Sequence, residues 1–328
     1  MKYLRIILPV FLTALFLSVS LLFLSNLVAP KNNTEAAGHD AWAAYGFEAE
    51  PRGTIDVFIL GDSESRTSVS PMQMYHDEGI TSYCCGVNSE NLTEAKQMLR
   101  RILKTQSPKL VILECNVLFT KFDWKDVLLE EAGYVFPVIT WHNRWKSLNA
   151  EDFTSVPDYT SREVRKGYYH SRVSQAAPID MQERYMAPDT EEEKLDAINV
   201  HVLGEIASIC RKNGIDLLLL STPSVKNWTM AKHNTCERLA ENLNEKAAGE
   251  GVRVDFVDMN LMTDVIPIDW ETDTRDKGDH LNNLGVEKVC AWLAPWLKEN
   301  YGLEDHREDP ACRQSWTDMY DDYLEWIT

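Results

Sequence analysis

The stretch Ile55-Asp56-Val57-Phe58-Ile59-Leu60-Gly61-Asp62-Ser63 decides how the rest of the chain is interpreted. Its first six residues form a short β-branched and apolar run, which predicts a buried strand. Gly61 permits a tight turn at the end of that strand, and Ser63 follows directly. In an open parallel sheet, ligands bind outside the carboxyl ends of the strands, so Ser63 is a candidate nucleophile. An ordinary turn is the alternative, because Gly, Asp and Ser all favour turns.

Downstream of this stretch, strand and helix patterns alternate. Further strands are predicted at residues 81–87, 108–115, 215–220 and 252–257, and helices at 89–106, 191–213, 231–249 and 283–301. Strands separated by helices imply parallel crossover connections and a sheet covered on both faces. The pattern therefore predicts an α/β domain over residues 54–301. Residues 117–190 lack a clear strand signal and are interpreted as an insertion.

The last segment, residues 302–328, is predicted to be separate from the domain. Trp316, Tyr320, Tyr323 and Ile327 recur at three- and four-residue steps. This spacing predicts one short amphipathic helix, which we expect to dock on the domain.

The N-terminus carries a long uncharged run between basic residues. Lys2 and Arg5 precede residues 6–28, which at 1.5 Å per residue reach about 35 Å, enough to cross a bilayer core. A cleaved signal peptide is the alternative, but its apolar core is shorter. We therefore predict a signal-anchor helix at 1–29, a linker that tethers the domain at 30–53, and a single-pass protein of the cell membrane. The basic residues place the domain outside the cytoplasm, with residues 6–28 in contact with lipid.

Composition and charge exclude one class of partner. The chain has 328 residues, with 33 Lys and Arg against 51 Asp and Glu, and a net charge of −18. Nucleic-acid affinity comes mainly from basic side chains on phosphates, so no nucleic-acid partner is expected. Seven cysteines, none in a CxxC spacing, do not settle the redox compartment.

A candidate base for Ser63 stands near the other end of the chain. The segment Asp276-Lys277-Gly278-Asp279-His280-Leu281-Asn282 precedes the last helix, and its histidine titrates in the range that a general base needs. An aspartate nearby could orient the imidazole. Asp276 is preferred over Asp279, because adjacent residues rarely bring a carboxylate onto a neighbouring imidazole. A Ser–His dyad stays open. The GxSxG motif of α/β-hydrolases is not found at Ser63.

These motifs resemble the SGNH (GDSL-like) hydrolase superfamily. The resemblance is carried by Gly61-Asp62-Ser63-Glu64-Ser65 with Ser70-Pro71, and by the HLNxxG string at residues 280–285. Both are similar to membrane-anchored members related to D-alanyl-lipoteichoic-acid transfer and alginate acetylation proteins. The resemblance covers about residues 54–300. It implies a three-layer αβα flavodoxin-like sandwich with a five-stranded parallel sheet.

The resemblance also implies site residues and an activity. The family's oxyanion donors correspond to the N–H groups of Ser63 and Gly86 and to Asn116, although Asn116 follows Glu114-Cys115 instead of the family's GxND pattern. The family's aspartate lies three residues before its histidine, where this chain has Lys277. The implied activity is that of a serine esterase or O-acyltransferase acting on acyl esters of a cell-envelope polysaccharide or glycopolymer. It implies that glycan or acylated polymer as partner, with a membrane acyltransferase as a possible second one.

The differences from the family pattern around Asn116 and at Lys277 also fit another class of function. A non-catalytic accessory subunit of an envelope modification or export complex would use the fold to bind glycan or a partner. A secreted lipase would need a broad apolar mouth, and the polar insertion does not suggest one.

Several further residues were considered for binding. His142 and Arg144, within Trp141-His142-Asn143-Arg144-Trp145, are predicted to line the substrate site together with Asp279, although the two tryptophans could equally form a packing corner. Residues 221–224 are predicted to lie on the rim of the site. Three aspartates at 273, 276 and 279 do not have the alternating spacing of a calcium loop, so no metal or cofactor is expected.

Overall fold

Five parallel strands form the central sheet in the computed structural model, which describes residues 3–34 and 42–328. The strands are β1 (Val57–Leu60), β2 (Ser82–Cys84), β3 (Leu110–Glu114), β4 (Asp216–Ser221) and β5 (Val254–Asp258), in the spatial order β2-β1-β3-β4-β5. The central strand β3 is buried at every position, as expected for a strand covered on both faces. The five predicted strands are all present, with ends within a few residues of the prediction.

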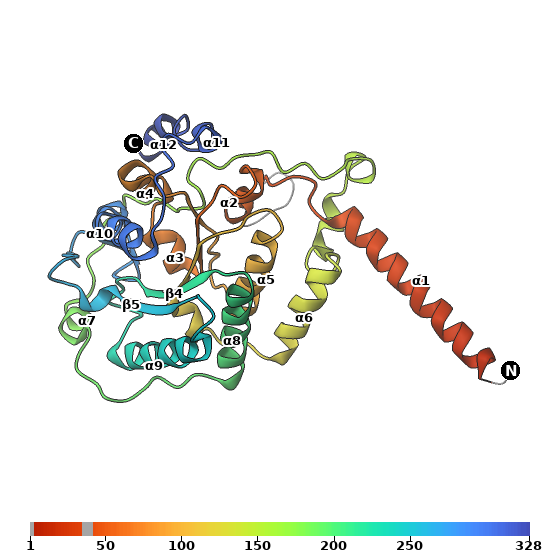
Figure 1. The fold of residues 1–328 in the computed structure, drawn as a ribbon, viewed down its shortest axis with the longest axis horizontal. Helices are drawn as coiled ribbons and strands as arrows, with labels where there is room; N and C mark the ends of the chain where they lie inside the picture. Colours follow the sequence, from red (N-terminus) through yellow and green to blue (C-terminus); the bar gives the residue numbers. More distant parts are fainter. Residues whose placement is uncertain (1–2, 35–41) are drawn as a thin grey trace.

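Helices cover both faces of this sheet (Figure 1). On one face α4 (Pro71–Glu78) packs against α10 (Asn283–Tyr301), and on the other α5 (Leu92–Ile102) and α9 (Met230–Ala247) pack against α8 (Ala197–Lys212). The predicted three-layer αβα fold is confirmed. Helix α4 was not predicted, although Ser70 caps it and a proline occupies its first turn, which are both helix-start signals.

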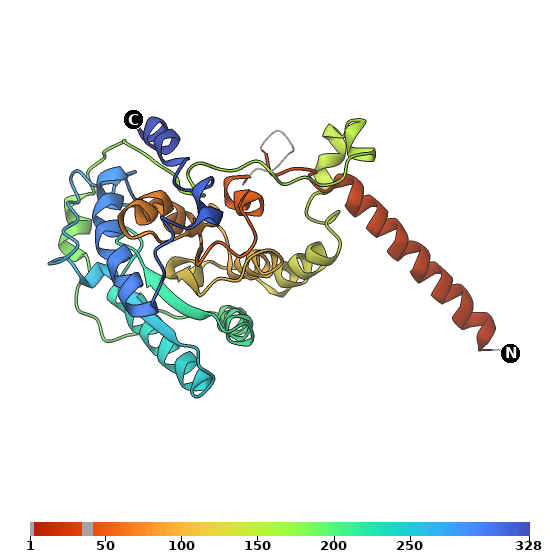
Figure 2. The same cartoon turned by 45° about the horizontal axis from the view of Figure 1, so that its top comes forward.

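The N-terminal helix α1 (Leu4–Val28) extends away from the domain in both views (Figure 1 and Figure 2). The side chains of its apolar run, residues 6–28, have a mean hydropathy of 2.6 and are mostly exposed. By length and composition this helix could cross a membrane. The predicted helix is therefore present, and its membrane topology stays a prediction.

The start of the predicted linker packs against the insertion. Asn33 is fully buried, and its amide exchanges two hydrogen bonds with the backbone of Ser161, at 2.7 and 3.1 Å. Lys31 is also buried, and its carbonyl accepts from the N–H of Asp158 at 2.7 Å. The polar side chains that suggested a solvated linker are therefore satisfied by the insertion. Residues 35–41 of the linker lie outside the described residues.

The insertion at 117–190 consists of loops and short helices. These are η3 (Cys115–Phe119), α6 (Trp124–Val135), η4 (His142–Ser147), η5 (Glu151–Phe153) and α7 (Ile179–Arg184). Its later part returns to the domain, where the Lys166 carbonyl accepts from the Cys84 N–H at 2.9 Å along the edge of β2. The Lys166 ammonium forms a fully buried ion pair with Glu50 at 2.6 Å. A buried pair of this kind is costly to break, so the insertion is an integral part of the domain.

The C-terminal segment docks on the domain, as expected, but its helix is shorter than predicted. It contains α11 (Pro310–Arg313) and α12 (Tyr320–Ile327), and Trp316 precedes α12. Trp316 is fully buried against Tyr75, with ring centroids 5.2 Å apart. The prediction that Trp316 shares the helix of Tyr320 was wrong, because the indole packs from a turn.

Candidate active site

The site is built where the strand order reverses. Strands β1 and β3 are neighbours in the sheet although β2 lies between them in the chain, so their carboxyl ends form the topological switch point at which open α/β sheets bind ligands. Gly61 ends β1 with a φ of 135°, and a Cβ there would lie 3.0 Å from the Cβ of Glu114. Helix α3 (Ser63–Ser68) begins immediately afterwards, with Asp62 accepting from the Glu64 N–H as its cap. Ser63 is thereby placed in the first turn of a helix that begins at this switch point.

A small antiparallel ribbon carries the histidine. It is formed by β6 (Thr274–Arg275) and β7 (His280–Leu281), joined by a turn in which Asp276, Lys277 and Gly278 all have positive φ. This turn brings Asp276 back over the residue four positions later. Its Oδ1 accepts from the His280 N–H at 3.0 Å, and its Oδ2 lies 2.9 Å from His280 Nδ1. The unusual spacing around Lys277 is therefore compatible with a carboxylate–imidazole contact.

The three predicted catalytic side chains meet. His280 Nε2 lies 2.8 Å from Ser63 Oγ, while Nδ1 faces Asp276. The His280 side chain is 13% exposed and that of Asp276 is 42% exposed, so the line of contacts runs from the protein surface at Asp276 inwards to His280. A neutral imidazole with its proton on Nδ1 can accept the Ser63 proton, which is the arrangement needed for an activated serine.

Glu64 is a fourth member of this cluster, and the sequence analysis assigned it no role. Its Oε2 lies 3.1 Å from Ser63 Oγ and 3.3 Å from His280 Nε2, and the residue is 3% exposed. Asn227 donates to Glu64 Oε1 at 2.5 Å and bridges it to Asp279. Two groups therefore compete for the Ser63 proton. The position of Glu64 directly after the serine in the quoted motif was the available signal.

The two carboxylates set the charge state of His280. Burial lowers the pKa of the imidazole, but the hydrogen bonds and charges of Glu64 and Asp276 outweigh burial and raise it to about 9. At neutral pH the ring is therefore mostly the imidazolium, with Ser63 free to donate to Glu64. The base form becomes dominant only as the pH rises above this pKa.

Asn116 lies beside the site, but other groups hold its amide. Asn116 Nδ2 donates to Asp62 at 2.9 Å, and its Oδ1 accepts from Lys232 Nζ at 3.1 Å. Burial and the charge of Glu64 raise the pKa of Asp62 to about 6, against the lowering effect of the Asn116 hydrogen bond. The amide therefore supports the turn that presents Ser63, and its predicted role as an oxyanion donor requires it to turn away from Asp62.

Gly86 packs against the same turn. A Cβ at Gly86 would lie 1.8 Å from Ser65 Oγ and 2.8 Å from the Asp62 carbonyl, so a side chain would displace the segment that carries Ser63. Burial raises the pKa of the Cys84 thiol to about 11, against hydrogen bonds from the Gly86 N–H and Ser65 that lower it. Glycine is required here for close approach, and its N–H faces Cys84 in this state.

Asn282 and Gly285 of the HLNxxG string also have structural roles. The Asn282 side chain caps α10 by accepting from two N–H groups, and it donates to the Thr272 carbonyl at 2.7 Å. A Cβ at Gly285 would lie 2.7 Å from the Asp273 carbonyl. The motif thus fixes the ribbon that holds His280 against the start of α10.

The structure separates the predicted substrate-lining residues. Asp279 lies at the rim, where its carboxylate binds Asn227 and Lys226. Arg144 instead donates to the Val28 carbonyl at 3.1 Å and to Asp152 at 2.6 Å. The exposed His142 lies on the same short helix, which contacts the end of α1, far from α3 in Figure 1 and Figure 2. The expectation that His142 and Arg144 lie beside Ser63 is corrected.

A different part of the insertion reaches the site. The Tyr169 N–H donates to the Arg66 carbonyl of α3 at 2.7 Å. The guanidinium groups of Arg66 and Arg275 lie over the Tyr169 ring, at 5.2 and 4.6 Å from its centroid. The sequence analysis missed this aromatic and its two cations, because only the fold brings residues 66, 169 and 275 together.

Two groups of possible metal ligands occur among the described residues. One is Glu64, Asp279 and His280 at the site itself, where the Asn227 amide already bridges the two carboxylates. Asp273, considered above with Asp276 and Asp279, binds Lys288 at 2.6 Å instead of joining them. The other group, around His306, lies away from Ser63.

The chain was compared with known proteins, and no family model and no curated protein matches it. Among solved structures, a putative acylhydrolase from Bacteroides fragilis is 11% identical, with coverage of 79% of this chain and 95% of that chain and a TM-score of 0.38. A lipase/acylhydrolase from Enterococcus faecalis is 10% identical, with coverage of 76% and 98% and a TM-score of 0.39. A GDSL-like lipase from Bacteroides thetaiotaomicron is 10% identical, with 74% and 88% covered and a TM-score of 0.35. At these values the functional argument rests on the side-chain geometry.

Proposed function

We propose that this chain is a serine esterase or O-acyltransferase that works through an acyl-enzyme on Ser63. The observation that supports the proposal is the continuous line from Ser63 Oγ to His280 Nε2 at 2.8 Å and from His280 Nδ1 to Asp276 at 2.9 Å. A serine activated by an oriented histidine attacks ester carbonyl groups.

The reaction proceeds in two halves. Ser63 Oγ attacks the ester carbonyl carbon while His280 Nε2 takes the serine proton, and Asp276 stabilises the imidazolium. The tetrahedral intermediate then expels the alcohol, which receives that proton, and the acyl group stays on Ser63. In the second half, water or a sugar hydroxyl attacks the acyl-enzyme and gives its proton to His280. The second tetrahedral intermediate then breaks the bond to Ser63 Oγ, which takes that proton back from His280, and the acid or the new ester is released. Hydrolysis and transfer differ only in this second nucleophile.

The oxyanion donors belong to the same proposal. The first N–H groups of a helix have no partner within the helix, so the Ser63 N–H at the start of α3 is available to the oxyanion. Gly86 and Asn116 are the predicted further donors. Both lie against the turn of residues 61–65, and each would contribute after release from Cys84 or Asp62 respectively.

The proposed substrate is an acyl ester of a cell-envelope polysaccharide or glycopolymer. Helix α1, long and apolar enough for a membrane anchor, supports this choice, because it would hold the domain next to a membrane. Lys2 and Arg5, which precede the apolar run of residues 6–28, favour an extracytoplasmic domain. A membrane acyltransferase would be a suitable acyl donor partner.

Fluorophosphonate labelling of the detergent-purified full chain tests the proposal. We expect modification at Ser63, located by mass spectrometry, and its loss in Ser63→Ala and His280→Ala. The matched controls are Ser208→Ala on α8 and His76→Ala, whose imidazole also pairs with an aspartate, Asp77, at 2.9 Å but in an exposed position. Labelling should persist in both controls.

One result would overturn the enzyme proposal. If the folded wild-type chain is not labelled and releases no p-nitrophenol from p-nitrophenyl acetate between pH 6 and about pH 10, Ser63 is not an activated nucleophile. The role as an accessory subunit that binds glycan or a membrane partner would then be favoured.

A further inference from the structure

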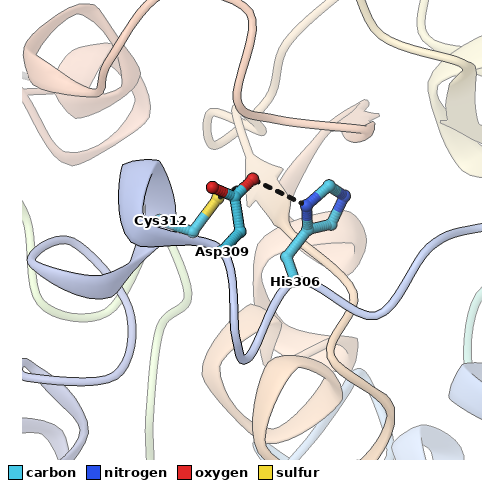
Figure 3. Close-up of side chains that lie close together, drawn as sticks. All are labelled: His306, Asp309 and Cys312. Carbon is cyan, nitrogen blue, oxygen red and sulfur yellow. Dashed lines mark hydrogen bonds and ion pairs between the residues drawn. The ribbon is translucent and has the colours of Figure 1, made fainter.

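A second group of titratable side chains lies near the amino-terminal end of strand β1, whereas Ser63 lies at its carboxyl end. Asp56 directly precedes β1, whereas Ser63 follows it, so the two groups of side chains are separated by the length of the strand. His306, Asp309 and Cys312 come from the segment that follows α10, and their side chains converge (Figure 3). None of these residues takes part in the proposed acyl-enzyme chemistry.

The three side chains offer one nitrogen, one oxygen and one sulfur at close range. Asp309 Oδ2 lies 3.4 Å from His306 Nδ1 and 3.8 Å from Cys312 Sγ, and all three atoms lie within 4.8 Å of one another. In a tetrahedral zinc site with usual bond lengths, the nitrogen–oxygen edge is about 3.3 Å and the sulfur–oxygen edge about 3.6 Å. Two edges of the cluster are therefore close to those of such a tetrahedron, and the third, from His306 Nδ1 to Cys312 Sγ, is at most 4.8 Å.

The surrounding contacts orient these atoms. His306 Nε2 lies 3.0 Å from Asp56 Oδ2, which also binds Lys109 at 3.2 Å. A histidine ligand usually donates its other N–H to a carboxylate in this way, which leaves the lone pair on the metal side. Asp309 Oδ1 accepts from the Ala311 N–H at 2.9 Å, so Oδ2 is the oxygen that faces the cluster.

The same geometry places an acceptor or donor atom of each side chain toward one point. With Nε2–H directed at Asp56, the lone pair of Nδ1 would face the Asp309 carboxylate, an arrangement that needs a proton or a metal ion between them. A proton on Nδ1 would satisfy that pair, with the S–H of the buried Cys312 donating to Asp309 Oδ2 at 3.8 Å, and one metal ion would replace both protons. A metal ion would satisfy all three groups.

We propose that His306 Nδ1, Asp309 Oδ2 and Cys312 Sγ bind one zinc-type divalent transition-metal ion, with water at the fourth position. Imidazole, carboxylate and thiolate are the ligands that zinc takes, and the thiol proton is released on binding. The ion would fasten the C-terminal segment to the start of β1, since Asp56 holds the histidine from that strand. The site is separate from the proposed esterase site, and its test does not depend on activity.

Cobalt binding to the full chain gives a direct test. The detergent-purified protein is treated with a chelator and a thiol-free reductant, and is then titrated with Co²⁺. We expect a thiolate-to-cobalt charge-transfer absorption that saturates at about one equivalent per chain and is displaced by Zn²⁺. Cys312→Ser should abolish this absorption. Cys290→Ser, at another fully buried cysteine on α10, should retain it.

Two further variants separate a metal ligand from a packing role. Asp309→Asn keeps an oxygen that can cap α11 and should weaken Zn²⁺ binding at least tenfold in competition with a chromophoric chelator. Asp56→Asn, which leaves all three proposed ligands in place, should weaken it about 10- to 100-fold. Circular dichroism establishes that each variant is folded, and Asp309→Asn decides the question if Cys312→Ser fails to fold.

The proposal has clear contrary outcomes. Wild-type protein that saturates with no thiolate absorption, or with an absorption that persists in folded Cys312→Ser, would overturn it. Unchanged Zn²⁺ affinity in both Asp309→Asn and Asp56→Asn would also overturn it, and would leave a protonated His306 between two carboxylates. Fluorophosphonate labelling of Ser63 should be the same in all these variants, so failure here is distinguishable from failure of the esterase proposal.

Discussion

Two histidines, which lie near opposite ends of strand β1, can be compared directly. His280 and His306 are equally buried, with 13% of each side chain exposed, and each has one ring nitrogen against an aspartate, at 2.9 and 3.0 Å respectively. Their second nitrogens differ. His280 Nε2 faces the Ser63 hydroxyl as well as the Glu64 carboxylate, whereas His306 Nδ1 faces a carboxylate and, beyond it, a thiol.

This difference teaches what sets the chemistry of a paired imidazole. Burial and the orienting carboxylate are shared, so they decide only that the ring is held in one orientation. The group opposite the free nitrogen decides the rest: a hydroxyl that can lose a proton suits acyl transfer, and a set of ligand atoms suits a metal ion. Substitutions at the two ends of β1 should therefore have separable effects.

The largest separation is expected from replacing each histidine. His280→Ala should lower kcat/KM for p-nitrophenyl acetate by about 10³- to 10⁶-fold, because the serine loses its base. His306→Ala should leave kcat/KM within about twofold of wild type. Steady-state rates on folded protein check both values. Comparable losses in the two variants would mean that the two ends of β1 are coupled and that the comparison fails.

Removing the orienting charge should have the next largest effect. Asp276→Asn keeps the shape of the turn but favours the wrong imidazole tautomer, so kcat/KM should fall by about 10²- to 10⁴-fold. The exposure of Asp276 places this effect below that of losing the histidine. Asp77→Asn, at the exposed His76 pair, is the matched control. A loss below threefold in Asp276→Asn would indicate a Ser–His dyad.

Glu64 should control the pH dependence. Together with Asp276 it raises the pKa of His280 to about 9, and the base must be neutral, so kcat/KM of the wild type should rise with pH to a plateau above this value. Glu64→Gln removes one raising charge, so the rise should move to lower pH. Activity at pH 7 should increase, by up to about tenfold for each unit that the pKa falls.

The pH profiles of the two proteins measure this effect directly. A rise at the same pH in wild type and Glu64→Gln would contradict the inhibitory role of the carboxylate. A lower plateau in Glu64→Gln, with the rise shifted as expected, would show that Glu64 also helps to place the serine.

The smallest effect is expected on stability at the other end of β1. Zn²⁺ at about 100 times its dissociation constant should stabilise the native chain by about 2.7 kcal/mol, which corresponds to a rise in Tm of several degrees. Cys312→Ser should lose this rise and keep its esterase rate. Differential scanning fluorimetry with and without Zn²⁺ provides the measurement. A Zn²⁺-dependent rise that survives in Cys312→Ser would place the ion elsewhere.

Local patterns explain how much of the fold could be predicted. Continuous apolar runs mark strands buried on two faces, and the bounds of α10 agreed with the prediction because Asn282 caps its start and Gly302 ends it. Ser63 and His280 were found for a related reason. Ser63 follows a strand and His280 precedes a helix, and the residues next to each of them in the chain indicate its role.

The rest of the site depends on contacts that no local pattern records. Asn227 reaches Glu64 across more than 160 positions of sequence, and Arg144 binds carbonyl groups of α1 that carry no side-chain signature. Adjacency in sequence favoured Asp276 over Asp279, but how Asp276 reaches the imidazole depends on the backbone of the turn, in which non-glycine residues adopt positive φ. The metal-ligand group at residues 306–312 was missed because its meaning depends on Asp56, far away in the chain.

The packed junction at the end of α1 has a consequence for reach. The Val138 N–H donates to Ser25 Oγ at 3.2 Å, and Arg144 binds the last carbonyl of the helix. The helix and the domain are therefore connected by direct hydrogen bonds. If α1 is the proposed anchor, Ser63 stands at a constant height above the lipid. Acyl groups would then be added or removed at one fixed distance from the membrane along a surface-bound polymer. Inserting a Gly-Ser segment after Val28 in an Arg144→Ala background should broaden that distance, as mapping of the modified positions would measure.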